Sequence, residues 1–158
     1  MGDQMNIEFH SASGKIQSFT NALGKQTTFT YSEQSQTFTN PANSEEVAFT
    51  FYTLTKIDHP DGTNEQFGYD GKGNITSYTD QAGQVWSYTC NSQGQVLTST
   101  NNPAGGVVTN TYKAETGLLA GVSDSLTNAE ISFVYDNDQR LSGFNRKNGV
   151  NATFTFVG

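Results

Sequence analysis

Pairs of aromatic residues two positions apart recur along the chain at a nearly constant interval. We call the second position of each pair the tyrosine slot. Complete and looser copies of the pattern place this slot at Phe9, Tyr31, Phe51, Tyr69, Cys90, Tyr112, Tyr135 and Phe156. The slots span 147 residues in seven intervals of 18–23 residues, with a mean of 21. A fixed period of this size is typical of a repeat architecture, so the chain is expected to fold as copies of one small unit.

Each interval contains two turns and two β-prone runs. In the copy that begins at Tyr69, a turn at Gly73 precedes the run 75–79, and a turn at Gly83 precedes the run 84–90. Thr, Val, Ile, Tyr and Phe suit a pleated, half-buried surface, while Gly, Asn and Asp supply the positive φ of tight turns. The pattern predicts antiparallel hairpins with strands of about five to seven residues, and no helix.

The aromatic pairs predict a ladder of rings along the sheet. Residues two apart on a strand point to the same face, as Trp86, Tyr88 and Cys90 would. We interpret this ladder mainly as the packing of a thin, aromatic-rich core. A ligand platform is the alternative.

One copy of the repeat is irregular. Asn110 and Tyr112 replace the Phe-x-Tyr pair, and Gly117 follows its slot by five residues instead of four. Because a shift of one residue would turn every side chain over, we expect a bulge or a longer turn near 103–106 or near 117–121.

Composition narrows the class of protein. Hydrophobic residues make up 34% and charged residues 15% of the chain, both low for a globular protein. The net charge is -7, and the eight Lys and Arg residues are scattered. Nucleic acid and anionic membranes need clustered cations, so neither is an expected partner. No segment approaches the roughly 18 apolar residues of a membrane span.

The reactive side chains lack the groupings that catalysis or metal binding needs. His10 and His59 stand at or beside turns, and the single cysteine, Cys90, occupies a packing slot. A zinc site needs three or four ligands, and residues 136–138 lack the glycine and distal glutamate of a calcium loop. Paired carboxylates occur in turns, where they cap their own backbone: Asp58 with Asp61, Asp136 with Asp138, and Glu45 with Glu46. We therefore predict no enzyme, no catalytic residue, no metal and no cofactor.

These motifs resemble the RHS/YD-repeat family, whose signature is Tyr-Asp, two variable residues, Gly, often Arg, and an aliphatic residue. Residues 69–75 read Tyr-Asp-Gly-Lys-Gly-Asn-Ile, with Asn in the Arg position. Residues 135–141 read Tyr-Asp-Asn-Asp-Gln-Arg-Leu, with Gln in the Gly position. Residues 79–83 and 58–62 resemble the family's mid-repeat turn. The resemblance covers roughly residues 9–158 and is strongest over 54–100 and 131–145.

The resemblance implies a fold and a role. Such repeats form long antiparallel sheets that spiral into shells, which in bacterial RHS proteins and insecticidal toxin complexes enclose a toxic domain. Wall-associated proteins and teneurins carry similar repeats. The expected fold is thus an all-β, extended or curled sheet of tandem YD hairpins that forms part of a spiral shell. The expected function is a non-catalytic structural module of a secreted or cell-surface bacterial protein.

The resemblance also implies an organisation and partners. We expect an N-terminal segment over residues 1–8 and a single module of about seven repeats over residues 9–158. The expected partners are neighbouring repeats or domains of a larger polypeptide, with an edge-strand dimer as a further possibility. The family's Asp-Pro-x-Gly autoproteolytic motif is absent from this sequence, and a closed shell needs more repeats than seven. The chain is expected to be either a fragment of such a protein or a small stand-alone one.

A binding module is the alternative function. Exposed rings stack on sugars, and an aromatic face also suits a protein partner. The residues that we predict for such carbohydrate or protein binding are Tyr78, Trp86, Tyr88 and Tyr112.

Overall fold

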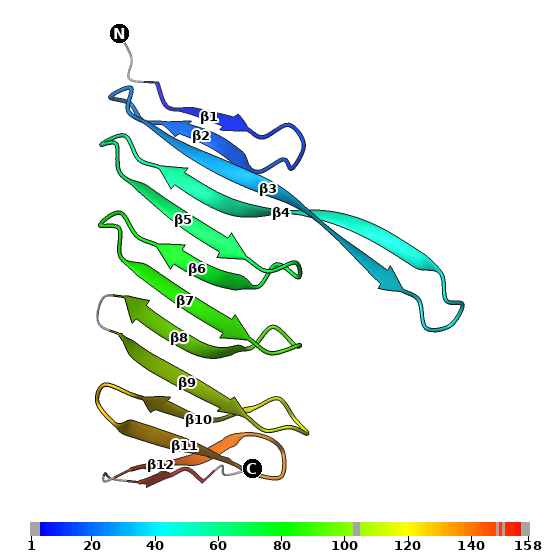
Figure 1. Ribbon diagram of the computed structural model, residues 1–158, viewed down its shortest axis with the longest axis vertical. Coiled ribbons are helices and arrows are strands. Elements are labelled where there is room, and N and C mark those ends of the chain that lie inside the picture. The colour runs from blue at the N-terminus through cyan, green and yellow to red at the C-terminus, as the bar shows by residue number, and fades with distance from the viewer. Residues whose placement is uncertain (1–3, 103–104, 148, 150, 156–158) are drawn as a thin grey trace. The chain divides into compact units, whose positions relative to one another are not determined.

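The chain forms antiparallel β-hairpins (Figure 1) in a computed structural model that describes residues 4–102, 105–147, 149 and 151–155. These residues form thirteen strands and no helix. The all-β hairpin architecture predicted from the repeat is therefore confirmed. Among them there is accordingly no helix of the length and apolarity that a membrane crossing demands. Phe156, and residues 103 and 104 of the predicted irregular turn, lie outside the described residues.

The chain divides into two compact units, residues 1–85 and 86–158. In each unit, hydrogen-bonded strands follow one another in chain order. The first unit contains β1 (Asn6–Phe9), β2 (Ile16–Thr20), β3 (Gln26–Thr39), β4 (Glu46–Asp58), β5 (Asn64–Tyr69) and β6 (Ile75–Thr79). The second contains β7 (Val85–Cys90), β8 (Val96–Asn102), β9 (Gly106–Tyr112), β10 (Leu119–Asp124), β11 (Ala129–Tyr135), β12 (Leu141–Arg146) and β13 (Ala152–Thr153). The boundary between the units falls after Val85, the first residue of β7. A single module over 9–158 after a segment 1–8 stays a prediction.

The Asp of the Tyr-Asp pair builds the turn immediately after it. Asp70 Oδ1 accepts hydrogen bonds from the backbone N–H groups of Lys72 and Asn74, both at 2.9 Å. Gly73 closes the turn with a φ of 85°, a conformation that a Cβ disfavours. The same pair of bonds, to the second and fourth residues onward, recurs at Asn21, Asp80, Asn91 and Asp136.

A β-bulge accompanies the tyrosine slot. Tyr69 pairs with Ile75, but the preceding Gly68 pairs with Ser77, so Thr76 is the extra residue. Equivalent register shifts precede Phe9, Tyr31 and Tyr135 and lie opposite Tyr112. An extra residue breaks the ladder and increases the local twist.

The irregularity predicted around residues 117–121 is confirmed. The turn after Tyr112 is one residue longer than the Asp70 turn, because Gly117 N–H donates to the carbonyl of Lys113, four residues back. A register shift lies just beyond it, between Leu119 and Gly121. Other tyrosine slots also have a bulge. The repeat that contains Tyr112 therefore differs from the repeat that contains Tyr69 in the length of its turn.

One hairpin departs from the predicted strand length. β3 and β4 contain 14 and 13 residues, and in Figure 1 their hairpin extends well beyond its neighbours in the first unit. The expectation of five to seven residues is wrong here, because Tyr31 is followed by strand instead of turn. Phe49 and Phe51 lie within β4, so their pair does not end a repeat. We call residues 32–53 of this hairpin the arm.

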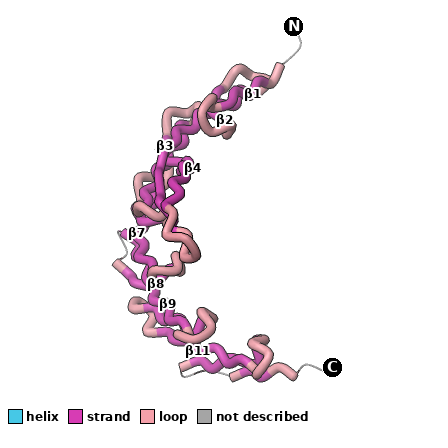
Figure 2. Tube along the Cα trace, turned by 90° about the vertical axis from the view of Figure 1, so that its right-hand side faces the viewer, coloured by secondary structure: helices cyan, strands magenta, loops and turns pink. Residues whose placement is uncertain are grey.

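The expected aromatic core is absent from the described residues. No hydrophobic residue among them is buried, and neither unit shows a second layer of strands in the turned view of Figure 2. The expectation of a buried core is wrong because the strands of each unit form one layer, with no opposing layer in that unit to cover the rings. The aromatics instead pack on each other while half-exposed, as Phe67 does on Tyr78 with ring centroids 5.2 Å apart.

Candidate functional site

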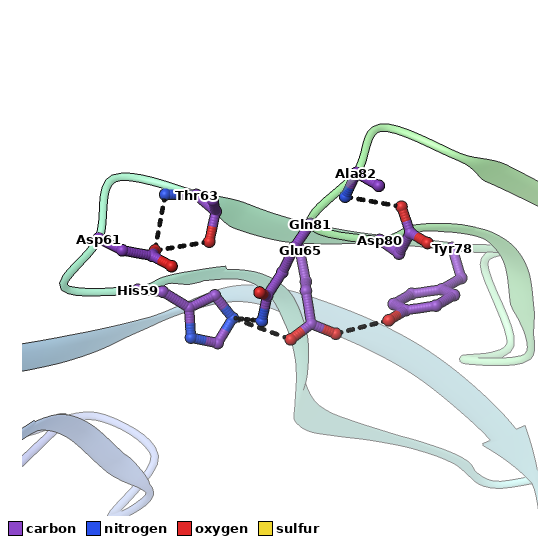
Figure 3. A network of polar contacts seen from close by, with 8 residues as sticks. All are labelled: His59, Asp61, Thr63, Glu65, Tyr78, Asp80, Gln81 and Ala82. Atoms are coloured by element: carbon purple, nitrogen blue, oxygen red, sulfur yellow. Dashed lines mark hydrogen bonds and ion pairs between the residues drawn. The ribbon is translucent and has the colours of Figure 1, made fainter.

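Four polar side chains meet beside β5 in the first unit (Figure 3). Glu65 lies on β5, His59 comes directly after β4, Tyr78 lies on β6 and Gln81 stands in the next turn. Glu65 Oε1 is 2.9 Å from His59 Nε2, and Glu65 Oε2 accepts the Tyr78 hydroxyl at 2.6 Å. Gln81 Nε2 lies 2.9 Å from the same His59 nitrogen. The carboxylate is thus the centre of the network.

Hydrogen bonds hold Glu65 in its charged form. The Tyr78 hydroxyl, followed by His59 and then the Gln81 amide, lowers the pKa of Glu65 below its ordinary value, against an opposing effect of burial. The His59 tautomer decides whether Nε2 donates to Glu65 or accepts from Gln81, because one ring nitrogen cannot do both.

This arrangement is suited to bracing rather than to proton transfer. A general base works best with a pKa near the operating pH and a free oxygen for its substrate. Glu65 has a lowered pKa, and both of its oxygens accept hydrogen bonds. The network therefore ties β5 and β6 to the turns at His59 and Gln81.

The carboxylates singled out in turns make local bonds. Asp61 Oδ1 accepts the side chain and backbone N–H of Thr63, and these bonds lower the pKa of Asp61. Arg140 lies 2.9 Å from both Asp136 and Asp138. Both carboxylates are therefore paired with the guanidinium of Arg140. Nowhere in the described ranges do three His, Cys, Asp or Glu residues gather as a metal site would require.

The four predicted stacking residues do not form one site within a unit. Tyr78 lies in the first unit, where its ring packs on Phe67 and its hydroxyl is engaged by Glu65. Trp86 and Tyr88 lie on β7 in the second unit, both half-buried and two residues apart. Tyr112 ends β9 in the same unit.

Tyr112 lines a pocket of about 540 Å³ in the second unit, between the turn after β7 and the turn after β9. Gln95 Nε2 donates to the Gly117 carbonyl at 2.7 Å, and Asn91 Nδ2 donates to Gln95 Oε1 at 2.8 Å. These bonds fix the two turns against each other. The pocket is lined by Asn91, Gln93, Gln95, Leu97, Tyr112, Lys113, Ala114, Glu115, Thr116 and Gly117. It combines amides, one ring and one charge of each sign.

Sequence reasoning missed the role of the tyrosine hydroxyls. Tyr135 donates its hydroxyl to the carbonyl of Leu119 at 2.9 Å, 16 residues back. Tyr112 does the same to Val96 at 2.9 Å, and Tyr31 to Ile16 at 2.8 Å. Each acceptor is the aliphatic residue that comes after a turn in the preceding hairpin. The constant offset of 15 or 16 residues was the available signal.

Comparison with known proteins agrees with a fold of tandem β-hairpin repeats. Residues 69–107 match the family model described as the RHS repeat. No curated protein matches the chain. The solved structure of TcdB2-TccC3 without its hypervariable C-terminal region aligns with a TM-score of 0.59 and 14% identity, over 92% of this chain and 8% of that one. TcdB2-TccC3-Cdc42 aligns with a TM-score of 0.52 and 14% identity, over 90% of this chain and 9% of that one.

At this identity the structural matches establish a shared fold, and the chain spans less than a tenth of the length of either neighbour. The repeat match places the family signature on the Tyr69 turn and the strands beyond it. Within the matched residues, the signature corresponds to the Asp70 turn and to the bulge at Tyr69. The resemblance to the RHS/YD-repeat family is thus confirmed by the RHS repeat match over residues 69–107.

Proposed function

We propose that this chain is a non-catalytic structural module of a secreted or cell-surface bacterial YD-repeat protein. It forms part of a larger repeat wall that encloses or displays a toxin domain. The matches to TcdB2-TccC3 and to the RHS repeat support a structural role. The partners are neighbouring repeats and domains of the same polypeptide, with edge-to-edge pairing of two copies as a further mode.

The exposed state of the sheet carries this proposal. No described hydrophobic residue is buried, although burial of apolar surface is the main driving force of folding. Large apolar side chains such as Phe9, Leu23 and Leu126 are more than half exposed. Further repeats and an enclosed domain would cover such surfaces, which is what a shell wall provides.

Cryo-electron microscopy of the natural polypeptide that carries this chain tests the proposal. We expect residues 4–155 to continue into adjacent repeats and to face an enclosed or displayed domain. A map in which this segment stands alone, with both faces in solvent, would contradict it.

A binding role is the second candidate, and the Tyr112 pocket favours it. Amide side chains and an aromatic ring are the groups that hold the hydroxyls and apolar faces of sugars, and Lys113 and Glu115 cancel in charge. A neutral glycan is the ligand class that fits. Tyr78, Trp86 and Tyr88 remain proposed stacking residues outside this pocket.

A glycan array on the purified chain tests this second function. We expect binding that is lost in Gln93→Ala, whose side chain lines the pocket on an exposed turn, and kept in Gln81→Ala on a turn of the first unit. Trp86→Ala and Tyr78→Ala test the other rings. Binding to no glycan, or equal binding by all variants, would remove this function and leave the structural role intact.

A further inference from the structure

The arm carries an exposed apolar strip on one face. Phe38 pairs with Val47, and Phe49 pairs with Gln36; paired residues, and those two apart, share a face of an antiparallel hairpin. Phe38, Val47 and Phe49 are 61%, 52% and 47% exposed. Phe49 continues the strip inward to Phe51, with ring centroids 5.9 Å apart. Three large apolar side chains thus lie together in solvent.

The base of the arm is supported on its apolar face by the turn after β5. Gln36 Nε2 donates to the carbonyl of Gly71 at 3.1 Å. A Cβ placed on Gly73 would lie 2.8 Å from Phe51 Cε2, so the Phe51 ring packs directly on glycine backbone.

The opposite face of the base is supported by the turn after β1. The His10 ring lies 5.8 Å from the Tyr31 ring and 5.6 Å from the Tyr52 ring. Tyr52 also donates its hydroxyl to Glu33 at 2.8 Å. Since both faces of the base are held, the arm presents its outer part in a defined position.

The arm also offers free backbone edges. β3 pairs with β2 only as far as Thr28, and β4 pairs with β5 only from Lys56 onward. In this fully described part of the first unit, β4 over residues 46–55 has β3 as its one strand neighbour. An unpaired edge is a template for a further strand.

The negative charge of the arm indicates which side chains a strand added to β4 would carry. Between residues 26 and 55 the charged side chains are Glu33, Glu45 and Glu46, and the sequence there has no Lys, Arg or His. Two arms would repel each other, because like charges brought together at an interface are unfavourable. A basic partner is favoured over a second copy of the chain.

We propose that the outer edge of β4, over Glu46–Thr50, binds an extended basic polypeptide segment with apolar side chains at alternate positions. Strand addition supplies main-chain hydrogen bonds, and alternate side chains supply specificity. The apolar side chains of the segment would cover Val47 and Phe49. Its cations would lie near Glu45 and Glu46. This partner site is additional to the structural role.

Binding of synthetic peptides to the purified chain, followed by fluorescence anisotropy, tests the proposal. The probe alternates Val and Thr and ends in two lysines; a matched peptide ends in two glutamates. We expect the lysine peptide to bind and the glutamate peptide to bind at least about tenfold more weakly. Absence of binding by the lysine peptide, or equal binding of both, would overturn the proposal.

Variants locate the site. Val47→Thr/Phe49→Thr should weaken the lysine peptide at least about tenfold, because it removes two apolar contacts while Thr keeps the strand. Val134→Thr, on an exposed position of β11, should bind as wild type. Circular dichroism checks that each variant is folded. Equal binding by the double variant would overturn the site, and sedimentation showing a dimer that the double variant abolishes would assign the strip to a second copy instead.

Discussion

Two hairpins of the first unit carry a tyrosine slot in their first strand, Tyr31 in β3 and Tyr69 in β5, and differ in the residues that come next. After Tyr69, Asp70 and Gly73 reverse the chain within five residues. After Tyr31 the sequence continues Ser-Glu-Gln-Ser-Gln, and β3 runs on to Thr39. The bulge is nevertheless present in both, since the register shifts at Tyr31 as it does at Tyr69. Strand length is therefore set by the turn residues, whereas the bulge accompanies the slot.

The largest expected effect comes from the point where the two hairpins touch. Gly73→Ala should lower the free energy of unfolding by about 2–4 kcal/mol, because it adds a steric clash with Phe51 to the cost of a positive φ. Gly83→Ala, at a similar φ with no atom near its Cβ, should cost only about 1–2 kcal/mol. Urea unfolding of both variants measures the difference. Equal losses would show that the arm does not rest on this turn.

The next effect concerns the tyrosine hydroxyls that donate to a backbone carbonyl, Tyr31 in the long β3–β4 hairpin and Tyr135 in the short β11–β12 hairpin. Tyr31→Phe and Tyr135→Phe should each lower the free energy of unfolding by about 0.5–1.5 kcal/mol, because each removes one hydrogen bond to a carbonyl. Tyr88→Phe is the control, since no hydrogen bond of its hydroxyl is seen among the described residues. Thermal unfolding followed by circular dichroism gives the three values. A loss of stability in Tyr135→Phe alone would show that this hydroxyl bond stabilises only the short hairpin.

A smaller, opposite effect is expected where a turn lacks its glycine. Gln139 adopts a φ of 63° in the position that Gly73 occupies in its own turn. Gln139→Gly should raise the free energy of unfolding by about 0.5–1 kcal/mol, because glycine tolerates this conformation without steric cost. Asn137→Gly, two residues earlier in the same turn, should give no gain. Chemical denaturation at neutral pH distinguishes them, and a destabilised Gln139→Gly would refute the turn argument.

The smallest effect is confined to acid. Because hydrogen bonds lower the pKa of Glu65 from its ordinary 4.5, its contribution to stability is present above that value and is lost as the pH falls through the lowered pKa. Glu65→Gln should therefore reduce the slope of unfolding free energy against pH below about 4.5. Glu115→Gln, on an exposed turn, is the matched control. An unchanged slope in Glu65→Gln would mean that the network contributes no linkage.

Much of the fold could be predicted from local residues. Asp70 with Gly73 marks a turn by its own chemistry, and the longer turn ending at Gly117 was visible as one extra residue. The length of β3 was not predicted, because the aromatic spacing was taken to mark a turn that Ser32 and Glu33 do not form. The Glu65 network was not predicted either, since it joins residues 6, 13 and 22 apart that come from different strands and turns.

The site residues show the same division. Tyr112 was predicted from its ring, but its pocket depends on Gln95 reaching across to Gly117. Tyr78 was predicted as a stacking surface, and the fold instead gives its ring to Phe67 and its hydroxyl to Glu65. Periodicity indicates which side of a strand a ring occupies, but not what lies opposite it.

By itself the sequence determined the hairpin repeat, its turns and the alternation of faces, because these depend on φ preferences and the two-residue period of a strand. Only the tertiary structure decided that the rings of each unit lie in a single layer with no described apolar side chain buried, and that one hairpin of the first unit projects as an arm with a free edge. Those outcomes depend on which strands meet and how far they pair, and the 21-residue aromatic period is the same whether or not another layer covers it.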